Sequence, residues 1–372
     1  MMNPFTGIGI EFHILQSFPV TCLNRDDVGA PKSAIVGGVQ RARVSSQCWK
    51  RQVRLALHDM GVKIGIRTKK LAELLADACK RHGATEAQAA ACATILANTL
   101  TKDTLFFLSV GEVDALAQYA QACGFTLPTE KKSAKKKNAA QEDETAGDVL
   151  AKTEMSKLKA CLSSAKTAAD GLDIALFGRM VAQEASLNVQ AATAFAHAIS
   201  THKVSNEVEF FTALDDLRDE PGSAHMGSLE YNSATYYRYV SLDLGQLWEN
   251  SHGDGMVTAV DAFVKALYLA VPAARQATQS GACLWDYARV LVRKGQRMQV
   301  SFDSPVTAKG EGYLAPSKDA LDAALERNAA RCGSLYGKLT DVTFGGQSEI
   351  SIDDLAKALT AQVAQLAQGG QA

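Results

Sequence analysis

The stretch that decides the fold is IGIEFHI, residues 8–14, in which apolar side chains occupy every second position. A period of two is typical of a β-strand that buries one face. Far along the chain, YYRYVSL at residues 236–242 has aromatic side chains on both sides of Arg238 and predicts a second strand. Helical segments separate the two stretches. We therefore expect an α+β domain with a large helical insertion.

Helix signals follow a long polar loop that we expect between residues 21 and 40. Ser45 is a suitable N-cap and Gly61 a suitable stop. The apolar residues between them share one helical face: Trp49, Val53, Leu57 and Met60. Further expected elements are an all-helical block over 68–125, a helix over 148–168, a strand-like stretch over 172–180, a helix over 256–270, a hairpin-like pair over 285–292 and 297–302, and two C-terminal helices.

Charge is distributed unevenly along the 372 residues. The net charge is −1, from 39 basic and 40 acidic side chains. Between residues 25 and 54 there are seven basic residues and only two acidic ones, so this segment carries +5 and the rest of the chain −6. Such a protein can hold a polyanion at the basic segment while its acidic remainder favours solubility.

Composition and motifs exclude several classes of protein. With 47% apolar and 21% charged residues, the chain is globular rather than fibrous or disordered. It has no apolar stretch of ~18 residues, no secretory signal at its N-terminus, and no C-x-x-C pair among its eight cysteines. We expect a cytoplasmic protein with reduced cysteines and no membrane partner. Glycine-rich phosphate loops are absent, which argues against nucleotide hydrolysis.

The best physical signal for function is the helix start inside the basic segment. Unpaired N–H groups at Ser45-Ser46-Gln47 would attract a phosphate, because the N-terminal end of a helix is positive. Lys50 and Arg54 add full charges one turn further on. Arg41 and Arg43 would point to one side of the preceding strand. The segment predicts a track for a polyphosphate, with a merely solvated basic surface as the alternative.

Candidates for catalysis or metal binding are few. Asp26 and Asp27 lie in the basic segment and could hold a divalent metal against phosphate. The plainer interpretation is that they accept backbone N–H bonds and anchor the loop. His197 and His202 are five residues apart, which does not suit chelation from a helix or a strand, so we interpret them as structural. We expect no catalytic residue, no cofactor and no metal.

Two polar segments interrupt the pattern of apolar residues. Residues 130–147 contain lysine runs followed by Glu142-Asp143-Glu144, and we expect a disordered surface loop there. About thirty residues before the strand at 236 are also mainly polar, which is longer than an ordinary connection and indicates a functional or mobile segment.

Several stretches together carry a family resemblance. The N-terminal ones are Asn24-Arg25-Asp26-Asp27, Lys32, residues 34–38, Arg41, Arg43, Ser45-Ser46-Gln47 and Lys50-Arg51. The later ones are DIALFGRM at 173–180, AHAI at 196–199, FTALDD at 211–216, GSAHMG at 222–227 and YRY at 237–239. In this order they resemble the CasC-type backbone subunit of Cascade, the type I-E CRISPR surveillance complex. Cys48-Trp49 stands where that family usually has Ser-Leu, and the insert at 130–147 has no counterpart there.

The resemblance implies a modified RNA-recognition-motif (ferredoxin-like) palm, residues 1–60 and 166–372, with a thumb hairpin at about 201–232 and a helical fingers insertion at 61–165. Copies of the subunit would line up along a CRISPR guide RNA, together with other Cascade subunits, and present the guide to a target DNA strand.

From the resemblance and the basic segment together, the residues expected to contact RNA are Asn24, Arg25, Lys32, Arg41, Arg43, Ser45, Ser46, Gln47, Lys50, Arg54, Arg179 and Met180. The residues expected to wedge into the guide–target duplex are Phe210, Phe211, Thr212 and Leu214. For Met180 and for the thumb cluster, burial in the subunit's own core is the alternative.

The sequence therefore leaves two hypotheses for the function, from different classes of protein. The first is a non-catalytic RNA-binding assembly subunit. The second is a metal-dependent endoribonuclease that cuts target RNA through Asp26 or Asp27, as related backbone subunits of type III complexes do with an acidic loop residue. We favour the first, because two adjacent carboxylates alone are too few ligands for a metal.

Overall fold

A computed structural model describes the chain at residues 2–101, 105–131, 148–164, 170–181, 185–214, 223–308, 310 and 312–369. The chain divides into two compact units. The first comprises Met1–Met60, Thr193–Gly245 and Val257–Ala372, and the second comprises Gly61–Ala192 and Gln246–Met256. The helical insertion expected at 61–165 is therefore shorter than the second unit. Most of the insert at 130–147 lies outside the described residues.

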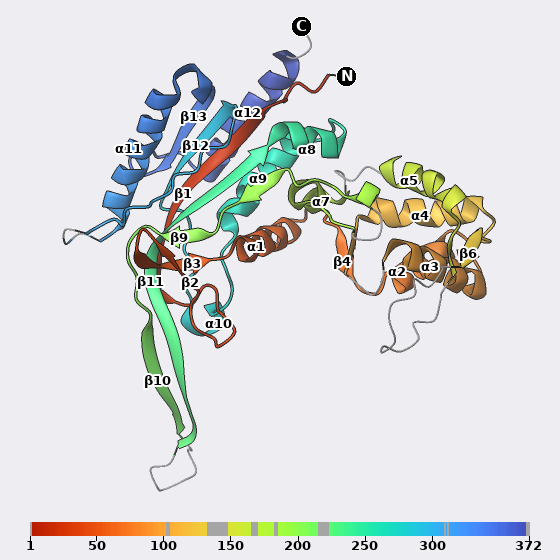
Figure 1. Cartoon of the computed structure of the whole chain (residues 1–372), viewed down its shortest axis with the longest axis horizontal. Coiled ribbons are helices and arrows are strands. Elements are labelled where there is room, and N and C mark those ends of the chain that lie inside the picture. Colours follow the sequence, from red (N-terminus) through yellow and green to blue (C-terminus); the bar gives the residue numbers. More distant parts are fainter. Residues whose placement is uncertain are drawn as a thin grey trace, which may run out of the picture. The chain divides into compact units, whose positions relative to one another are not determined.

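The first unit is built on a nine-stranded sheet (Figure 1). Along its main path the strands are β13 (Lys338–Gly345), β12 (Tyr287–Lys294), β1 (Ile8–Thr21), β11 (Ser223–Asp243), β9 (Ala198–Ser200), β3 (Val39–Val44) and β2 (Ser33–Val36). Two more strands, β8 (Thr193–Phe195) and β10 (Glu207–Leu214), pair with β11. β1 and β11 are antiparallel neighbours, with Phe12 opposite Val240. The two strands predicted from their alternation are confirmed, although β1 buries both faces rather than one, since Glu11 and His13 are buried as well as Phe12. The chain is an α+β protein with a large antiparallel sheet.

The expected loop over 21–40 is partly wrong, because β2 and the beginning of β3 lie within it. Val36 pairs with Val39, so the two strands are joined by Gly37-Gly38 alone. Both glycines have a positive φ, 60° and 75°. A two-residue hairpin turn needs this left-handed backbone, which glycine adopts without strain.

Helices cover both faces of the sheet. On one face Phe12 packs edge-on against Phe263 of α9 (Met256–Leu269), with ring centroids 6.0 Å apart. On the same face lies α1 (Ser46–Asp59), which buries Trp49. On the other face Tyr237 lies in one apolar cluster with Leu321 of α11 (Leu314–Cys332). The helices predicted over 45–61 and 256–270 are confirmed.

The C-terminal region contains a strand that the sequence patterns did not reveal. Two helices were expected there, and α11 and α12 (Ile352–Gly369) are present, but β13 lies between them and extends the sheet. The Oγ1 of Thr340 in β13 donates to Oε1 of Gln362 in α12 at 2.7 Å. The first unit also contains α10 (Gln276–Gln279) and a 3-10 turn at Gly333–Tyr336, whereas α8 (Leu244–Ser251) begins in the first unit and continues in the second.

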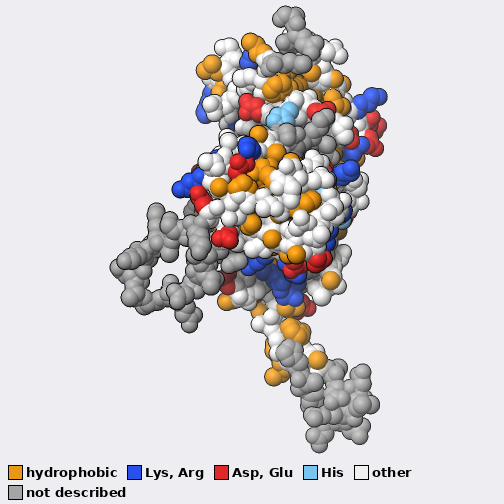
Figure 2. Space-filling model, turned by 90° about the vertical axis from the view of Figure 1, so that its right-hand side faces the viewer, with side chains coloured by type: hydrophobic (Ala, Val, Ile, Leu, Met, Phe, Trp, Pro, Cys, Tyr) orange, Lys and Arg blue, Asp and Glu red, His pale blue; other side chains and the backbone are white. Residues whose placement is uncertain are grey.

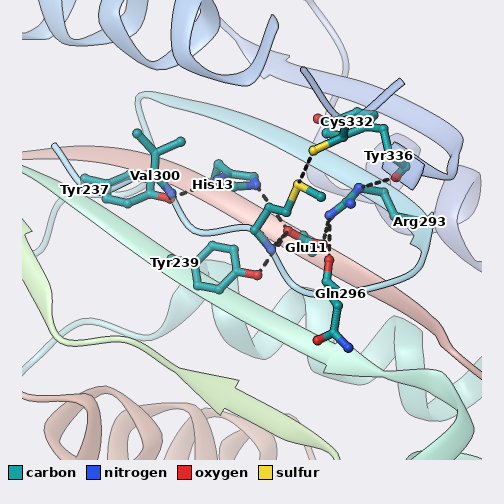
Figure 3. Close-up of polar contacts among 10 residues, drawn as sticks. Glu11, His13, Tyr237, Tyr239, Arg293, Gln296, Val300, Cys332 and Tyr336 are labelled. Atoms are coloured by element: carbon teal, nitrogen blue, oxygen red, sulfur yellow. Dashed lines mark hydrogen bonds and ion pairs between the residues drawn. The ribbon is translucent and has the colours of Figure 1, made fainter. Parts of the chain in front are cut away.

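A buried polar network lies on the α11 face of the sheet (Figure 3). Its centre is Glu11, 3% exposed, which forms an ion pair with Arg293, 1% exposed. The second carboxylate oxygen of Glu11 accepts hydrogen bonds from the Tyr239 hydroxyl at 3.0 Å and from the Met298 amide at 3.1 Å. Burial opposes ionisation of Glu11, but His13, Arg293 and the Met298 amide outweigh it and lower the pKa of this carboxyl. The network therefore fastens the segment after β12 onto the sheet.

That fastening explains why the expected second half of a hairpin, residues 297–302, is not a strand. The Val300 amide donates to the Tyr237 hydroxyl at 3.2 Å, and the Met298 amide donates to Glu11. Because side chains of β1 and β11 supply these acceptors, the alternating residues of this segment need no strand ladder. The segment lies across the sheet face instead of pairing with β12.

Two histidines are buried in neutral form and should make the first unit sensitive to acid. Burial lowers the pKa of His13 and of His202 below the usual 6.5. Above that value neither state of the chain binds a proton, so stability does not depend on these groups. Below it the unfolded chain binds protons that the folded chain resists, and the free energy of unfolding should fall by about 1.4 kcal/mol per pH unit for each histidine.

Urea unfolding between pH 7.5 and 5 measures this slope. The variant His202→Gln should lose its share of this slope, to which His197 also contributes because its pKa is lowered too. His58, whose side chain is 68% exposed, provides the matched control, and His58→Gln should leave the slope unchanged. A stability that is flat over this range would contradict the prediction.

The second unit is mainly helical. Its helices are α2 (Leu71–Arg81), α3 (Glu86–Leu100), α4 (Val110–Ala122), α5 (Met155–Ser164) and α7 (Leu172–Phe177), and short 3-10 turns lie at Lys152–Glu154 and Ala185–Leu187. The short strand pairs are β4 (Ile66–Thr68) with β5 (Phe106–Leu108), and β6 (Thr129–Lys131) with β7 (Asp148–Leu150). The block over 68–125 is thus not entirely helical, and the helix expected over 148–168 begins later, after β7. No helix in the described part of the chain is long and apolar enough to span a membrane.

The expected strand-like stretch over 172–180 is wrong, because α7 occupies its first two thirds. Asp173 is fully buried, and its Oδ1 accepts hydrogen bonds from the amides of Gly65 at 2.8 Å and Ile174 at 3.1 Å. This carboxylate ties the helix start to a segment more than a hundred residues away in sequence. Local apolar spacing could not show such a contact.

Candidate nucleic-acid interface

The start of α1 has the geometry of an anion-binding helix end. Ser45 is the N-cap, and its Oγ accepts a hydrogen bond from the Cys48 amide at 3.2 Å. The Ser46 amide donates to Nδ1 of His197 at 3.2 Å. Within the described part of the chain the Gln47 amide has no partner, and the Gln47 side chain is exposed. Of the amides expected to receive a phosphate, that of Gln47 is available without breaking a bond.

Asn24 holds this helix start in place. Its Oδ1 accepts a hydrogen bond from the Ser45 amide at 2.9 Å, and its carbonyl oxygen accepts one from the Lys32 amide at 2.9 Å. Asn24, expected from the resemblance to contact RNA, thus joins the loop that carries Lys32 to the first residue of the helix cap. Its side-chain oxygen is already engaged.

Basic side chains surround this end of the helix. Burial, then Arg43 and Lys32, lower the pKa of His197, so its Nδ1 is an unprotonated acceptor for the Ser46 amide. Arg43 also donates from Nε to the Ser33 carbonyl at 3.3 Å, which orients its guanidinium. Lys50 is half-buried, with Nζ 5.7 Å from the centre of the Phe195 ring, and burial lowers its pKa. The structure therefore gathers Lys32, Arg43 and Lys50 at one helix end.

The other basic residues of the segment differ in exposure. Arg25 and Arg51 are exposed, and Arg54 is half-buried. Arg51, which was not among the expected contacts, and Lys32 are the two charges that act on the Cys48 thiol, although burial dominates and raises its pKa. Arg51 is therefore a further basic side chain near this helix end, in the second turn of α1.

Arg41 requires a correction, because the structure does not place it where a phosphate could reach it. Its side chain is 0% exposed. Nη1 donates to the Ser200 carbonyl at 2.7 Å, and Nη2 donates to the carbonyls of Phe302 at 3.0 Å and Asp303 at 3.2 Å. Arg41 shapes the fold beneath the interface, whereas Arg43, two residues later, lies closer to its surface.

Asp26 anchors its loop, as the plainer interpretation had it. Its Oδ1 accepts hydrogen bonds from the amides of Val28 at 3.0 Å and Ala30 at 2.9 Å. The neighbouring Asp27 is exposed. Among the described residues, no three histidine, cysteine, aspartate or glutamate side chains lie close enough to share a metal ion.

A two-stranded ribbon formed by β10 and the first part of β11 extends from the sheet (Figure 1). Phe210 is opposite Ser228 and Thr212 is opposite Met226, so these side chains share one face of the ribbon. On that face Val208, Phe210 and Met226 are 66%, 65% and 62% exposed. Apolar side chains are visible along the ribbon in Figure 2. The stripe is not buried in the core of the described unit.

Phe211 corrects the expectation of a single apolar cluster. Because side chains alternate along a strand, Phe211 lies on the opposite face from Phe210, and it is opposite Gly227. A Cβ on Gly227 would lie 2.6 Å from the Phe211 ring, so the glycine leaves room for that ring to cover it. Leu214 belongs to β10, but its side chain and residues 215–222 are outside the described part.

The base of the ribbon is tied to the basic loop, which the sequence did not reveal. Nδ2 of Asn206 donates to the Pro31 carbonyl at 3.3 Å and to the Glu230 carboxylate at 3.1 Å. Nδ2 of Asn232 donates to Oδ1 of Asn206 at 3.1 Å. These amide contacts join β10, β11 and the loop that ends in Lys32. Isolated asparagines, one before β10 and one within β11, give no sequence signal for such a link.

Arg179 and Met180 belong to the second unit, and they differ in exposure: the Arg179 side chain is buried and Met180 is exposed. Nη1 of Arg179 donates to both Glu112 carboxylate oxygens at 2.8 Å and to the Phe107 carbonyl at 3.0 Å, and its side chain is 6% exposed. The expectation that Arg179 contacts RNA is therefore corrected to a structural ion pair. Met180 is 84% exposed, so the core alternative for this methionine is wrong. Gly178, with φ of 76°, forms the turn before them.

Fold and interface together define a class: an α+β protein with a large antiparallel sheet, a basic helix end suited to phosphate, and a ribbon with exposed apolar side chains. Residues 10–368 match the family model described as CT1975-like protein, and the chain belongs to that family.

The chain is also similar to solved structures. The chain is similar to one described as "CRISPR RNA-guided surveillance complex, pre-nicking", with 27% identity, a TM-score of 0.74, and coverage of 95% of this chain and 99% of the other. A second, "CRISPR RNA-guided surveillance complex", has 22% identity, a TM-score of 0.67 and the same coverage, and supports the fold alone. No curated protein matches the chain.

Proposed function

We propose that this protein is the CasC-type backbone subunit of a type I-E Cascade, acting in the cytoplasm as a non-catalytic holder of CRISPR guide RNA. The observation that carries the proposal is the α1 start, where the available Gln47 amide lies among Lys32, Arg43, Lys50 and Arg51. The similarity over 95% of the chain to a subunit of an RNA-guided complex supports it.

In this proposal the first unit is the RNA-recognition-motif-like palm, the second unit is the fingers, and the β10–β11 ribbon is the thumb. Copies of the subunit lie head to tail along the guide beside other Cascade subunits. Phosphates of the guide lie at the α1 start, where contacts fix the position of the strand without discriminating between bases. The guide bases are left for pairing with a target DNA strand.

The direct test is binding of the purified chain to single-stranded RNAs of unrelated sequence over a range of salt concentrations. We expect similar affinities for all of them, and a log-affinity that falls with log salt by about 0.7 for each phosphate contacted. A salt-independent affinity, or a strong preference for one base sequence, would refute a holder that binds through phosphates.

The endoribonuclease alternative has its own test. RNA-loaded complex is incubated with complementary RNA and Mg²⁺, and with Asp26→Ala and Asp27→Ala variants in parallel. We expect no cleavage by any of them. Cleavage by the unmodified complex that disappears in the Asp27 variant would establish the nuclease, since Asp27 is exposed and Asp26 already anchors the loop.

The exposed ribbon stripe predicts an effect on target pairing alone. Phe210→Ala should change the stability of the free subunit by less than about 0.5 kcal/mol, because the side chain is already exposed. Under the proposal this side chain parts a step of the guide–target duplex. The variant should protect the guide normally but change the reactivity of target bases toward single-strand probes.

Ser228→Ala, at the exposed ribbon position opposite Phe210, is the matched control and should leave that reactivity unchanged. A Phe210→Ala complex whose probe pattern equals that of the unmodified complex would show that the stripe does not touch the duplex.

A further inference from the structure

Arg238 is a buried cation without an anionic partner. It lies in β11 beneath α1 and is 2% exposed. Its guanidinium carbon is 3.6 Å from the centre of the Trp49 ring, and Nη1 donates to Oε1 of Gln16 at 2.5 Å. In the described part of the chain, Nε and Nη2 have no hydrogen-bond partner.

Other buried arginines of the first unit are better compensated, with one unpartnered nitrogen each in the described part of the chain, Nε of Arg41 and Nη2 of Arg293. Arg41 donates to three backbone carbonyls, and Arg293 is paired with the Glu11 carboxylate and donates from Nε to the Tyr336 carbonyl at 2.9 Å. A buried charge is unfavourable unless hydrogen bonds and an opposite charge compensate it. Burial alone lowers the pKa of Arg238, to about 9, so the group is still cationic at neutral pH.

Arg238 lies close to the start of α1, where its charge can act on a bound anion. Trp49, on which the guanidinium stacks, belongs to the first turn of α1, and the residue after it is Lys50. The helix end is itself positive, so the amides, the surface cations and Arg238 all add to a potential of one sign. Charges in a protein interior are screened less than charges in water. The buried guanidinium therefore contributes to the attraction of an anion at the α1 start.

We propose that Arg238 is a buried positive charge whose counter-charge is the phosphate backbone of bound RNA. This inference rests on the proposed function and deepens it. In the free subunit the guanidinium has no opposite charge, and the Gln16 hydrogen bond and the Trp49 ring offset its desolvation only in part, so it destabilises the fold. When a phosphate strand lies at the α1 start, the same charge strengthens binding without touching the RNA. Arg238 therefore acts on the RNA only through long-range electrostatic attraction.

The test measures stability and binding in the same variants. Arg238→Gln removes the charge and keeps a donor for Gln16, and Arg238→Met is a second neutral replacement. Each should raise the melting temperature of the free subunit by about 3 °C or more. Each should also weaken binding of the homopolymer poly(U) at low salt by about fivefold. Arg238→Lys keeps the charge and should bind poly(U) within about twofold of the unmodified protein.

Arg293→Gln is the matched control at an equally buried arginine. It leaves the Glu11 carboxylate unpaired and should lower the melting temperature. A lowered melting temperature in both neutral Arg238 variants would overturn the inference, and so would a raised one with unchanged poly(U) affinity. If the unmodified protein itself fails to bind RNA, the proposed function fails, while the comparison of melting temperatures still decides whether the charge is uncompensated.

Discussion

Glu11→Leu is expected to lower the free energy of unfolding of the first unit by about 3–5 kcal/mol, because it removes one member of a buried ion pair. Arg293 would keep its charge in a site that is 1% exposed, without the carboxylate that compensates it. The Tyr239 hydroxyl and the Met298 amide would lose their shared acceptor as well. Breaking one partner of such a pair is far more harmful than replacing both.

The measurement is urea unfolding followed by tryptophan fluorescence. Trp49 and Trp285 are buried in the first unit, and Trp248 belongs to the second, so the experiment uses a Trp248→Phe background. Glu326→Leu, at an exposed position of α11, is the control and should change stability by less than about 0.5 kcal/mol. A loss below about 1 kcal/mol in Glu11→Leu would show that the network contributes little.

Lys50→Ala/Arg54→Ala is expected to weaken guide binding by about tenfold or more at low salt, independently of the guide sequence. Each lost phosphate contact should reduce the magnitude of the log-affinity against log-salt slope by about 0.7, so the pair should reduce it by about 1.4. The structure supports the choice of Lys50, which lies one turn into α1 beside the Phe195 ring.

Arg327→Ala/Lys357→Ala removes the same charge from exposed positions of α11 and α12 and serves as the control. It should leave the salt slope unchanged, because those helices are outside the basic segment. Equal effects of the two double variants would mean that RNA responds to net charge only, and the α1 site would lose its support.

Local patterns were sufficient where neighbours along the chain decide the structure. The alternation at 8–14 and at 236–242 predicted β1 and β11, because a period of two is visible in neighbouring residues alone. Ser45 and the apolar residues after it predicted α1 and its cap, because capping uses an amide three residues away.

Distant partners decided the places where sequence reasoning failed. Residues 297–302 have the alternation of a strand, but their amides bind Glu11 and Tyr237. Arg41 and Arg43 have the spacing of a pair, yet carbonyls of Ser200 and Phe302 enclose only the first. The exposure of a side chain depends on which distant residues pack against it, and the residues next to it in sequence do not reveal these contacts.

The covered sheet face bears on which guide sequences the protein can hold. In RNA-recognition motifs, aromatic side chains on the sheet stack directly on bases. Here Tyr237 and Tyr239 are 1% and 5% exposed beneath the segment that carries Met298 and Val300. Under the proposed function, the protein therefore binds its RNA without discriminating between base sequences. A cell can then use any newly acquired guide at once, because a new guide sequence requires no change in the protein that binds it.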